Sequence, residues 1–234
     1  MYANGWLRNG NTPEGIVEGV KRVVDQGYTA LKLYPFGGEQ VAKIDRIEHG
    51  VALVEATRQA AGPQTEIGID IRARLNIWSA RRVAQALEPF NIAWMEEPIL
   101  WDNPEALAQF AHEVRVPVAT GEQLYTRWGF RALLELNAVG IIQPDICHAG
   151  GISELKKIAA MAETYYVTLA PHNSNGPLST IASLDLDLCI HNSLMQEIFL
   201  ESIPLYNKVL SQPIEVIDGY CVPPEGPGWG VGLK

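Results

Sequence analysis

Short apolar runs alternate with amphipathic segments along almost all of the 234 residues of the chain. Strands that alternate with helices form a parallel sheet, because each helix returns the chain to the start of the next strand. The pattern contains about eight such units, and eight units in a chain of this length favour a closed barrel over an open sheet. No Gly-x-Gly-x-x-Gly motif follows a predicted strand, which disfavours a dinucleotide-binding sheet. The sequence therefore predicts an α/β fold, a TIM-type (β/α) barrel of parallel strands.

The boundaries of the expected elements come from capping residues and from changes in the apolar pattern. Thr12 and Pro13 suit a helix start, because threonine caps helices and proline fits the first helical position. Further helices are expected over residues 43–61, 79–87, 104–112, 127–136, 152–165 and 178–191. Strands are expected over residues 30–34, 67–69, 93–95, 116–119, 141–143 and 168–170, with 2–4 and 195–197 as candidate first and last strands. Proline and glycine become frequent from residue 205, so we expect a catalytic barrel over 1–204 and a C-terminal extension over 205–234.

Composition limits the partners and the compartment that we expect. The formal net charge of −9 disfavours nucleic acid and anionic membranes as partners. No apolar run reaches the roughly 18 residues of a transmembrane helix, and no signal peptide is visible at the start. The three cysteines, Cys147, Cys189 and Cys221, match no zinc pattern. We therefore expect buried free thiols and a cytoplasmic location.

Three acidic residues follow three successive predicted strands. Asp70, Glu96 and Glu122 are spaced at intervals of 26 residues, one strand–helix unit each. The carboxyl ends of parallel strands share one rim of a barrel, which is where barrel enzymes build their sites. Three carboxylates at one rim repel one another unless a cation lies between them, and oxygen ligands suit Mg²⁺. The spacing predicts a Mg²⁺ site, and the alternative is three unrelated surface acids at loop starts.

The series of polar residues continues after the next strands. Asp145 and His172 are 27 residues apart, so they are expected on adjacent strands. A carboxylate that hydrogen-bonds one ring nitrogen of a histidine makes the other nitrogen a better base. The alternative for His172 is a capping residue before the turn at Gly176. Glu197 follows His172 by another 25 residues and is either a further site residue or an ordinary exposed acid.

Lys32 and Tyr34 share one face of the second predicted strand, because side chains alternate with a period of two. If that face points into the mouth of the barrel, the Lys32 ammonium would stabilise negative charge on a substrate oxygen. The apolar neighbours Leu31 and Leu33 argue against a solvated strand end for Lys32. Tyr34 is explained equally well by packing and by catalysis.

Four segments resemble the mandelate racemase branch of the enolase superfamily. They are residues 94–98 (Trp-Met-Glu-Glu-Pro), 119–122 (Ala-Thr-Gly-Glu), 143–151 (Gln-Pro-Asp-Ile-Cys-His-Ala-Gly-Gly) and 170–173 (Ala-Pro-His-Asn). The likeness covers nearly the whole chain, and the joint pattern with its spacing is highly specific. The Gln196-Glu197 pair and its distance from His172 look most similar to galactonate and related sugar-acid dehydratases.

The resemblance implies a set of roles for these residues. It implies Mg²⁺ ligation by Asp70, Glu96 and Glu122, an acid/base dyad of Asp145 and His172, and Glu197 as hydrogen-bond donor to a substrate carboxylate oxygen. Lys32 matches the first lysine of the family's Lys-x-Lys pair. The implied activity is dehydration of a small acid sugar to a 2-keto-3-deoxy acid. A racemase or epimerase that uses the same enediolate, and a catalytically silent truncated barrel, are the alternatives.

Three features depart from the family pattern. Tyr34 occupies the second lysine position, which disfavours a racemase with lysine and histidine on opposite faces of the substrate. Arg72 stands where galactonate and mannonate dehydratases carry a histidine, and we expect it to bind a substrate carboxylate or hydroxyl. Because the sequence begins at what looks like the first barrel strand, we expect it to lack the N-terminal α+β capping domain of the family. We expect the flank that it normally covers to expose apolar surface and to favour a homo-oligomer.

Overall fold

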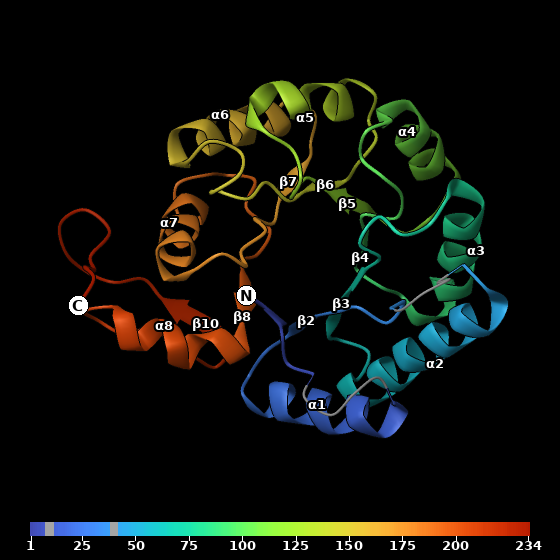
Figure 1. The fold of residues 1–234 in the computed structure, drawn as a ribbon, viewed down its shortest axis with the longest axis horizontal. Coiled ribbons are helices and arrows are strands. Elements are labelled where there is room, and N and C mark those ends of the chain that lie inside the picture. The colour runs from blue at the N-terminus through green and yellow to red at the C-terminus, as the bar shows by residue number, and fades with distance from the viewer. Residues whose placement is uncertain (8–11, 38–41) are drawn as a thin grey trace.

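The computed structural model describes residues 1–7, 12–37 and 42–234. Within them, eight parallel strands form one curled sheet in the order β7-β6-β5-β4-β3-β2-β1-β8, and helices surround it (Figure 1). A parallel bridge from Leu169 of β7 to Ser193, just before β8, joins the two ends of the sheet. The fold is a TIM-type (β/α) barrel, as the sequence predicts, and none of the described residues forms a separate α+β capping domain.

The elements lie close to their expected positions. The strands of the barrel are β1 (Tyr2–Asn4), β2 (Ala30–Leu33), β3 (Glu66–Asp70), β4 (Trp94–Glu96), β5 (Val118–Thr120), β6 (Ile141–Ile142), β7 (Thr168–Leu169) and β8 (Glu197–Phe199). The helices are α1 (Pro13–Asp25), α2 (Ile44–Ala61), α3 (Ile77–Leu87), α4 (Pro104–Glu113), α5 (Thr126–Glu135), α6 (Ile152–Glu163), α7 (Pro177–Asp187) and α8 (Ile203–Val209), with 3-10 turns at Glu88–Phe90 and Leu200–Ser202.

Capping side chains explain where two helices begin. The Thr12 hydroxyl accepts a hydrogen bond from the Gly15 amide at 3.2 Å, so α1 begins at the predicted residue. The helix expected from residue 79 begins two residues earlier, because the Asn76 side chain accepts from the Ser79 amide at 2.9 Å and caps it there. The sequence signal for this cap was present, but the apolar pattern alone does not reveal it.

The last strand lies two residues later than expected. β8 pairs with β1 in a register that sets Glu197 opposite Tyr2 and Phe199 opposite Asn4. This register sets Ile198 opposite Ala3, and both side chains are fully buried. A strand that ended at residue 197 would leave Ile198 outside this pairing. Glu197 therefore begins β8 instead of ending it.

The C-terminal segment packs against the barrel at α7. Tyr206, Leu210 and Ile214 form a buried apolar cluster with Ile181 and Leu184 of α7. Beyond α8, β9 (Glu215–Ile217) and β10 (Tyr220–Val222) form a short antiparallel hairpin. The boundary that we expected at residue 204 lies inside α8, and the division of the chain into two parts stays a prediction.

The structure tests two expectations from composition, the state of the cysteines and the absence of a membrane-spanning helix. The three cysteines are free thiols, but the expectation that they are buried is wrong: Cys147 and Cys189 are exposed and Cys221 is partly exposed. They lie after β6, after the end of α7 and in the hairpin, where the chain runs along the surface. No helix in the described part of the chain is both long and apolar enough to cross a membrane.

The barrel interior leaves no room for a side chain at Gly68. Trp94 lies opposite Gly68 on the neighbouring strand, and its buried ring packs edge-on against Tyr2 at 5.2 Å between ring centroids. A Cβ atom on Gly68 would collide with the Trp94 ring. The glycine is therefore what allows the tryptophan to fill the centre of the barrel.

Replacing Gly68 with alanine is expected to lower the free energy of unfolding by about 1–3 kcal/mol, because it overfills a packed interior. Urea unfolding followed by tryptophan fluorescence measures the change. Gly140→Ala is the matched control, since a Cβ there would meet only Pro117 Cβ at 3.9 Å. Equal stabilities for the two variants would contradict the packing argument.

Candidate functional site

A cavity of about 570 Å³ lies at the carboxyl ends of the barrel strands. Five of the predicted site residues line it: Lys32, Asp70, Arg72, Glu122 and His172. Three others, Glu96, Asp145 and Glu197, form hydrogen bonds or ion pairs with these lining residues. Eight of the predicted residues therefore meet at one end of the barrel.

Lys32 is buried between two carboxylates. Its Nζ lies 2.7 Å from Glu96 Oε1 and 2.7 Å from Glu197 Oε1, and all three side chains are at most 2% exposed. Burial by itself would lower the pKa of Lys32, but the charges of Glu197 and Glu96 outweigh it and hold that pKa well above its ordinary value. Lys32 is therefore a fixed cation at the edge of the cavity.

The other oxygen of Glu96 also has partners. Trp94 Nε1 donates to Glu96 Oε2 at 3.1 Å, and Gln143 Nε2 donates to the same atom at 2.7 Å. A carboxylate with this many donors is held in one orientation. Trp94 and Gln143 were not predicted as site residues. Gln143 directly follows β6, so it lies at the same end of the barrel strands as the predicted acids.

Glu197 accepts hydrogen bonds through both of its side-chain oxygens. Asn4 Nδ2 donates to Oε1 at 2.8 Å, and the Asn173 amide donates to Oε2 at 2.8 Å. Burial would raise the pKa of Glu197, but Lys32 and His172 outweigh it and lower the pKa. Glu197 is thus an ionised acceptor in this arrangement, and the donor role implied by the resemblance stays a prediction.

Asp70, Glu96 and Glu122 lie at the ends of three adjacent strands. Asp70 is directly paired with Glu96 in the register of β3 and β4, and Glu122 follows β5. Burial raises the pKa of Asp70 to about 7, and the like charges of Glu96 and Glu122 add to this effect. As the described side chains stand, no group of three histidine, cysteine or acidic residues encloses a possible metal position. The oxygen chemistry and the mutual repulsion nevertheless fit a hard dication, because a cation would offset this charge.

His172 and Asp145 form the predicted pair. His172 Nδ1 lies 2.7 Å from Asp145 Oδ2, and the Asp145 side chain is fully buried. Burial would lower the pKa of His172, but the hydrogen bond with Asp145 and the charges of Glu197 and Glu122 raise it to about 9. Because Asp145 is an ionised acceptor, Nδ1 carries the proton. Nε2 lies 3.4 Å from Glu122 Oε2, on the side of the cavity.

Asp145 is itself held by several donors. The Cys147 amide donates to Oδ1 at 2.7 Å, and Asn175 Nδ2 donates to Oδ2 at 2.6 Å. Burial would raise the pKa of Asp145, but the hydrogen bond with His172 outweighs it and lowers the pKa. The carboxylate is fixed in position and keeps the imidazole in one tautomer.

Tyr34 lies beside the site but does not line the large cavity. It lines a separate cavity of about 180 Å³, and its buried hydroxyl has no hydrogen-bond partner among the described residues. Its ring lies 4.3 Å from the Arg72 guanidinium carbon and 5.6 Å from that of Arg74. The Tyr34 ring therefore packs against the guanidinium group of Arg72, which lines the large cavity. A catalytic role for Tyr34 stays a prediction.

Glu97 is a residue of the large cavity that the sequence argument missed. It is 3% exposed, and burial, with smaller effects from Glu122 and Glu96, raises its pKa to about 8. Its position directly after Glu96 was visible in the sequence. The sequence argument took the first acidic residue after each predicted strand, so it selected Glu96 and passed over the neighbouring acid.

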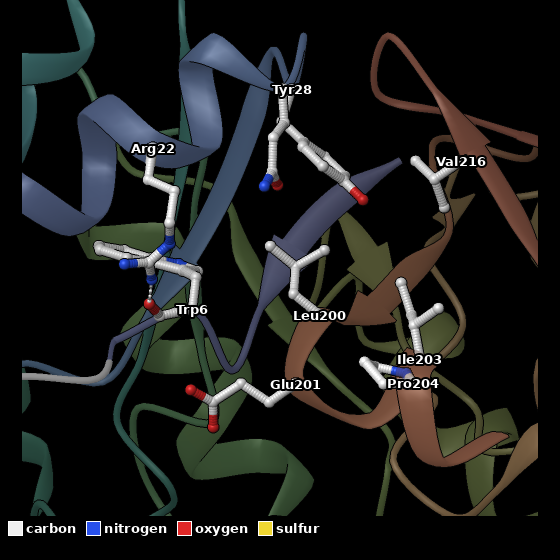
Figure 2. Close-up of a pocket in the computed structure, with 9 residues that line it drawn as sticks. Trp6, Arg22, Tyr28, Leu200, Glu201, Ile203, Pro204 and Val216 are labelled. Carbon is white, nitrogen blue, oxygen red and sulfur yellow. Dashed lines mark hydrogen bonds between the residues drawn. The ribbon is translucent and has the colours of Figure 1, made fainter. Parts of the chain in front are cut away.

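A second cavity, of about 470 Å³, lies on the flank of the barrel. Figure 2 shows Arg22 and Tyr28 on one side of it and Leu200, Ile203 and Val216 on the other. None of the predicted site residues lines this cavity. The chemistry predicted from the sequence therefore belongs to the cavity at the strand ends.

Comparisons with known proteins agree with the fold. Residues 15–234 match the model of a family described as enolase C-terminal domain-like. The D-galactonate dehydratase of Pectobacterium atrosepticum is 34% identical over 246 residues, covering 100% of this chain and 63% of that protein. This chain therefore spans less than two thirds of the length of that relative.

Two solved structures of similar proteins have the same fold as this chain. A mandelate racemase/muconate lactonizing enzyme-like protein from Roseovarius has a TM-score of 0.93 and 34% identity, over 99% of this chain and 61% of that one. A mandelate racemase/muconate lactonizing enzyme from Sulfitobacter has a TM-score of 0.93 and 33% identity, over 100% of this chain and 61% of that one. Both similarities cover the whole barrel.

Proposed function

The chain belongs to the enolase C-terminal domain-like family, and from that premise we propose that it dehydrates a sugar acid to a 2-keto-3-deoxy acid. The observation that carries the proposal is the pair of His172 and Asp145 in a ring that lines the cavity, with Nε2 of the imidazole 3.4 Å from Glu122 Oε2. The name of the relative from Pectobacterium atrosepticum supports dehydration as the class of reaction. The sugar acid itself is left open.

Asp70, Glu96 and Glu122 are the residues that would hold Mg²⁺. Their burial at adjacent strand ends and the raised pKa of Asp70 support this assignment. When bound, Mg²⁺ would act as a Lewis acid that offsets negative charge on the substrate carboxylate. Arg72, which lines the cavity, would contact a carboxylate or hydroxyl of the same substrate.

His172 would carry the proton in both halves of the reaction. The neutral form of its imidazole removes the proton from the carbon next to the carboxylate through Nε2, and Asp145 stabilises the imidazolium that forms. A dication held by Glu122 would offset one of the charges that raise the pKa of His172 to about 9, and would so favour the neutral form. The bond to the β-hydroxyl then breaks, and the imidazolium returns the proton to the leaving oxygen as water. The enol product becomes the keto acid. Tyr34 is less well placed as the donor, because it lines a different cavity.

The position of Lys32 supports dehydration with one base over racemisation with two. The ammonium held between Glu96 and Glu197 keeps its proton, because both carboxylates stabilise the charged form, so it is not available as a second base. Its charge would instead stabilise the enediolate oxygens as they gain negative charge.

The function is tested by incubating the protein with Mg²⁺ and a panel of acid sugars. We expect a 2-keto-3-deoxy acid to accumulate with at least one of them, detected as the semicarbazone. Exchange of the proton at carbon 2 in D₂O without keto acid would indicate an epimerase or racemase instead. The absence of both exchange and keto acid would indicate a silent barrel and would contradict the proposal.

A further inference from the structure

The Asp145 carboxylate accepts hydrogen bonds from four donors, two on each oxygen. The Cys147 amide donates to Oδ1 at 2.7 Å, and the His148 amide donates to the same atom at 3.2 Å. His172 Nδ1 and Asn175 Nδ2 donate to Oδ2 at 2.7 Å and 2.6 Å. A carboxylate has about four lone-pair sites, so these donors use the whole capacity of Asp145.

His172 and Asn175 reach the same oxygen from one loop, which joins β7 to α7. Between them, the Asn173 amide donates to Glu197 Oε2 at 2.8 Å, and its side chain donates to the Glu197 carbonyl at 3.2 Å. The loop is therefore tied to Asp145 after β6 and to Glu197 in β8. Asn175 lies outside the four segments that carry the family resemblance, so the resemblance assigns it no role.

We propose that Asn175 is a positioning residue that acts through Asp145 on His172. Its amide occupies one side of Asp145 Oδ2, so the Nδ1–H group of His172 approaches only from the other side. The imidazole then has one orientation, the one in which Nε2 lies 3.4 Å from Glu122 Oε2. The role of His172 as the base rests on the proposed function. Asn175 does not line the large cavity, so it does not act on the substrate directly.

The exposure of Asn175 determines which substitution tests this role. Its side chain is exposed, whereas that of Asp145 is fully buried. Alanine would let water reach Oδ2, and a water molecule replaces the lost hydrogen bond. Leucine has nearly the shape of asparagine, so it would keep water away and leave that side of Oδ2 without a donor. The His172 ring would then be free to turn toward the vacated side, and a small misplacement of a base is costly for catalysis.

The test measures kcat and KM with Mg²⁺ and the acid sugar that the wild type converts fastest. We expect Asn175→Leu to lower kcat about tenfold, because the base is misplaced, and to leave KM within about twofold, because no contact with the substrate is lost. Asn175→Ala should lower kcat only about threefold, since water fills the gap. Asn175→Gln keeps an amide donor and should also stay within about threefold of the wild type.

Gln109→Leu is the matched control, because it removes an exposed amide that donates to the Glu113 carboxylate at 3.3 Å on α4. It should change neither constant. Proton NMR supplies a readout that does not need turnover. The Nδ1 proton of His172 should give a low-field resonance that is absent from His172→Asn. Exchange with water should broaden this resonance in Asn175→Leu and not in Gln109→Leu.

Three results with Asn175→Leu would overturn the proposal: the wild-type kcat, a higher KM at unchanged kcat, or an unchanged resonance. An equal loss of kcat in Gln109→Leu would also overturn it. Absence of keto acid from the wild type would contradict only the proposed function, and the resonance would then decide whether Asn175 holds His172 in place.

Discussion

Replacing His172 with asparagine is expected to lower the rate of keto-acid formation by about a thousandfold, the usual size of a lost general base. Asparagine keeps a donor that can pair with Asp145 Oδ2, but it offers no basic atom to the cavity. Proton exchange at carbon 2 should fall by the same factor, because both reactions begin with the same abstraction. Initial rates of keto-acid formation and NMR of the exchange in D₂O measure the two effects.

The control for this variant is His112→Asn, which changes an exposed histidine at the end of α4. It should leave both rates unchanged. Thermal unfolding of His172→Asn should stay close to that of the wild type, since the Asp145 hydrogen bond is replaced. A His172→Asn protein that dehydrates every accepted acid at the wild-type rate would refute the assignment of the base.

Replacing Lys32 with methionine is expected to lower the free energy of unfolding by about 3–5 kcal/mol. The substitution preserves much of the side-chain volume but leaves Glu96 and Glu197 as buried charges without their cation. Removing one partner of a buried ionic group costs more than the group contributed, because the remaining charges cannot reach water. Urea unfolding with linear extrapolation measures the loss.

A second substitution separates this charge effect from a packing effect. Adding Glu197→Gln to Lys32→Met removes one of the unpaired charges, so the double variant should be more stable than Lys32→Met alone. Lys156→Met, at an exposed position on α6, should change stability by less than about 0.5 kcal/mol. If Lys32→Met is no worse than Lys156→Met, the buried ion pairs are not important for stability.

Much of the fold was predictable because its rules are local. A strand and the helix after it each follow from a pattern within a few residues, and Thr12 caps α1 as expected. The position of the three acids was predictable for a related reason. Parallel strands end on the same side of a barrel, so residues spaced by one strand–helix unit along the chain lie close together. Asp70, Glu96 and Glu122 needed no knowledge of the barrel's radius or twist.

The parts that were missed depend on longer-range geometry. The orientation of Glu97 depends on a left-handed backbone that is held by hydrogen bonds to two other strand–loop segments. The start of β8 depends on its register with β1, which lies at the other end of the chain. Neither of these follows from residues close in sequence.

The pairing of β1 with β8 has a consequence for biosynthesis. A ribosome makes Lys32 and Asn4 early and Glu197 late, yet these side chains contact one another in the finished protein. Until β8 has emerged, one of the carboxylates that neutralises the Lys32 ammonium does not exist, and the first strand lacks a neighbour along one edge. Contacts between residues this far apart in sequence form slowly. A nascent chain halted before residue 197 would therefore hold an unfinished ring and a poorly compensated cation, which makes it a candidate for chaperone capture.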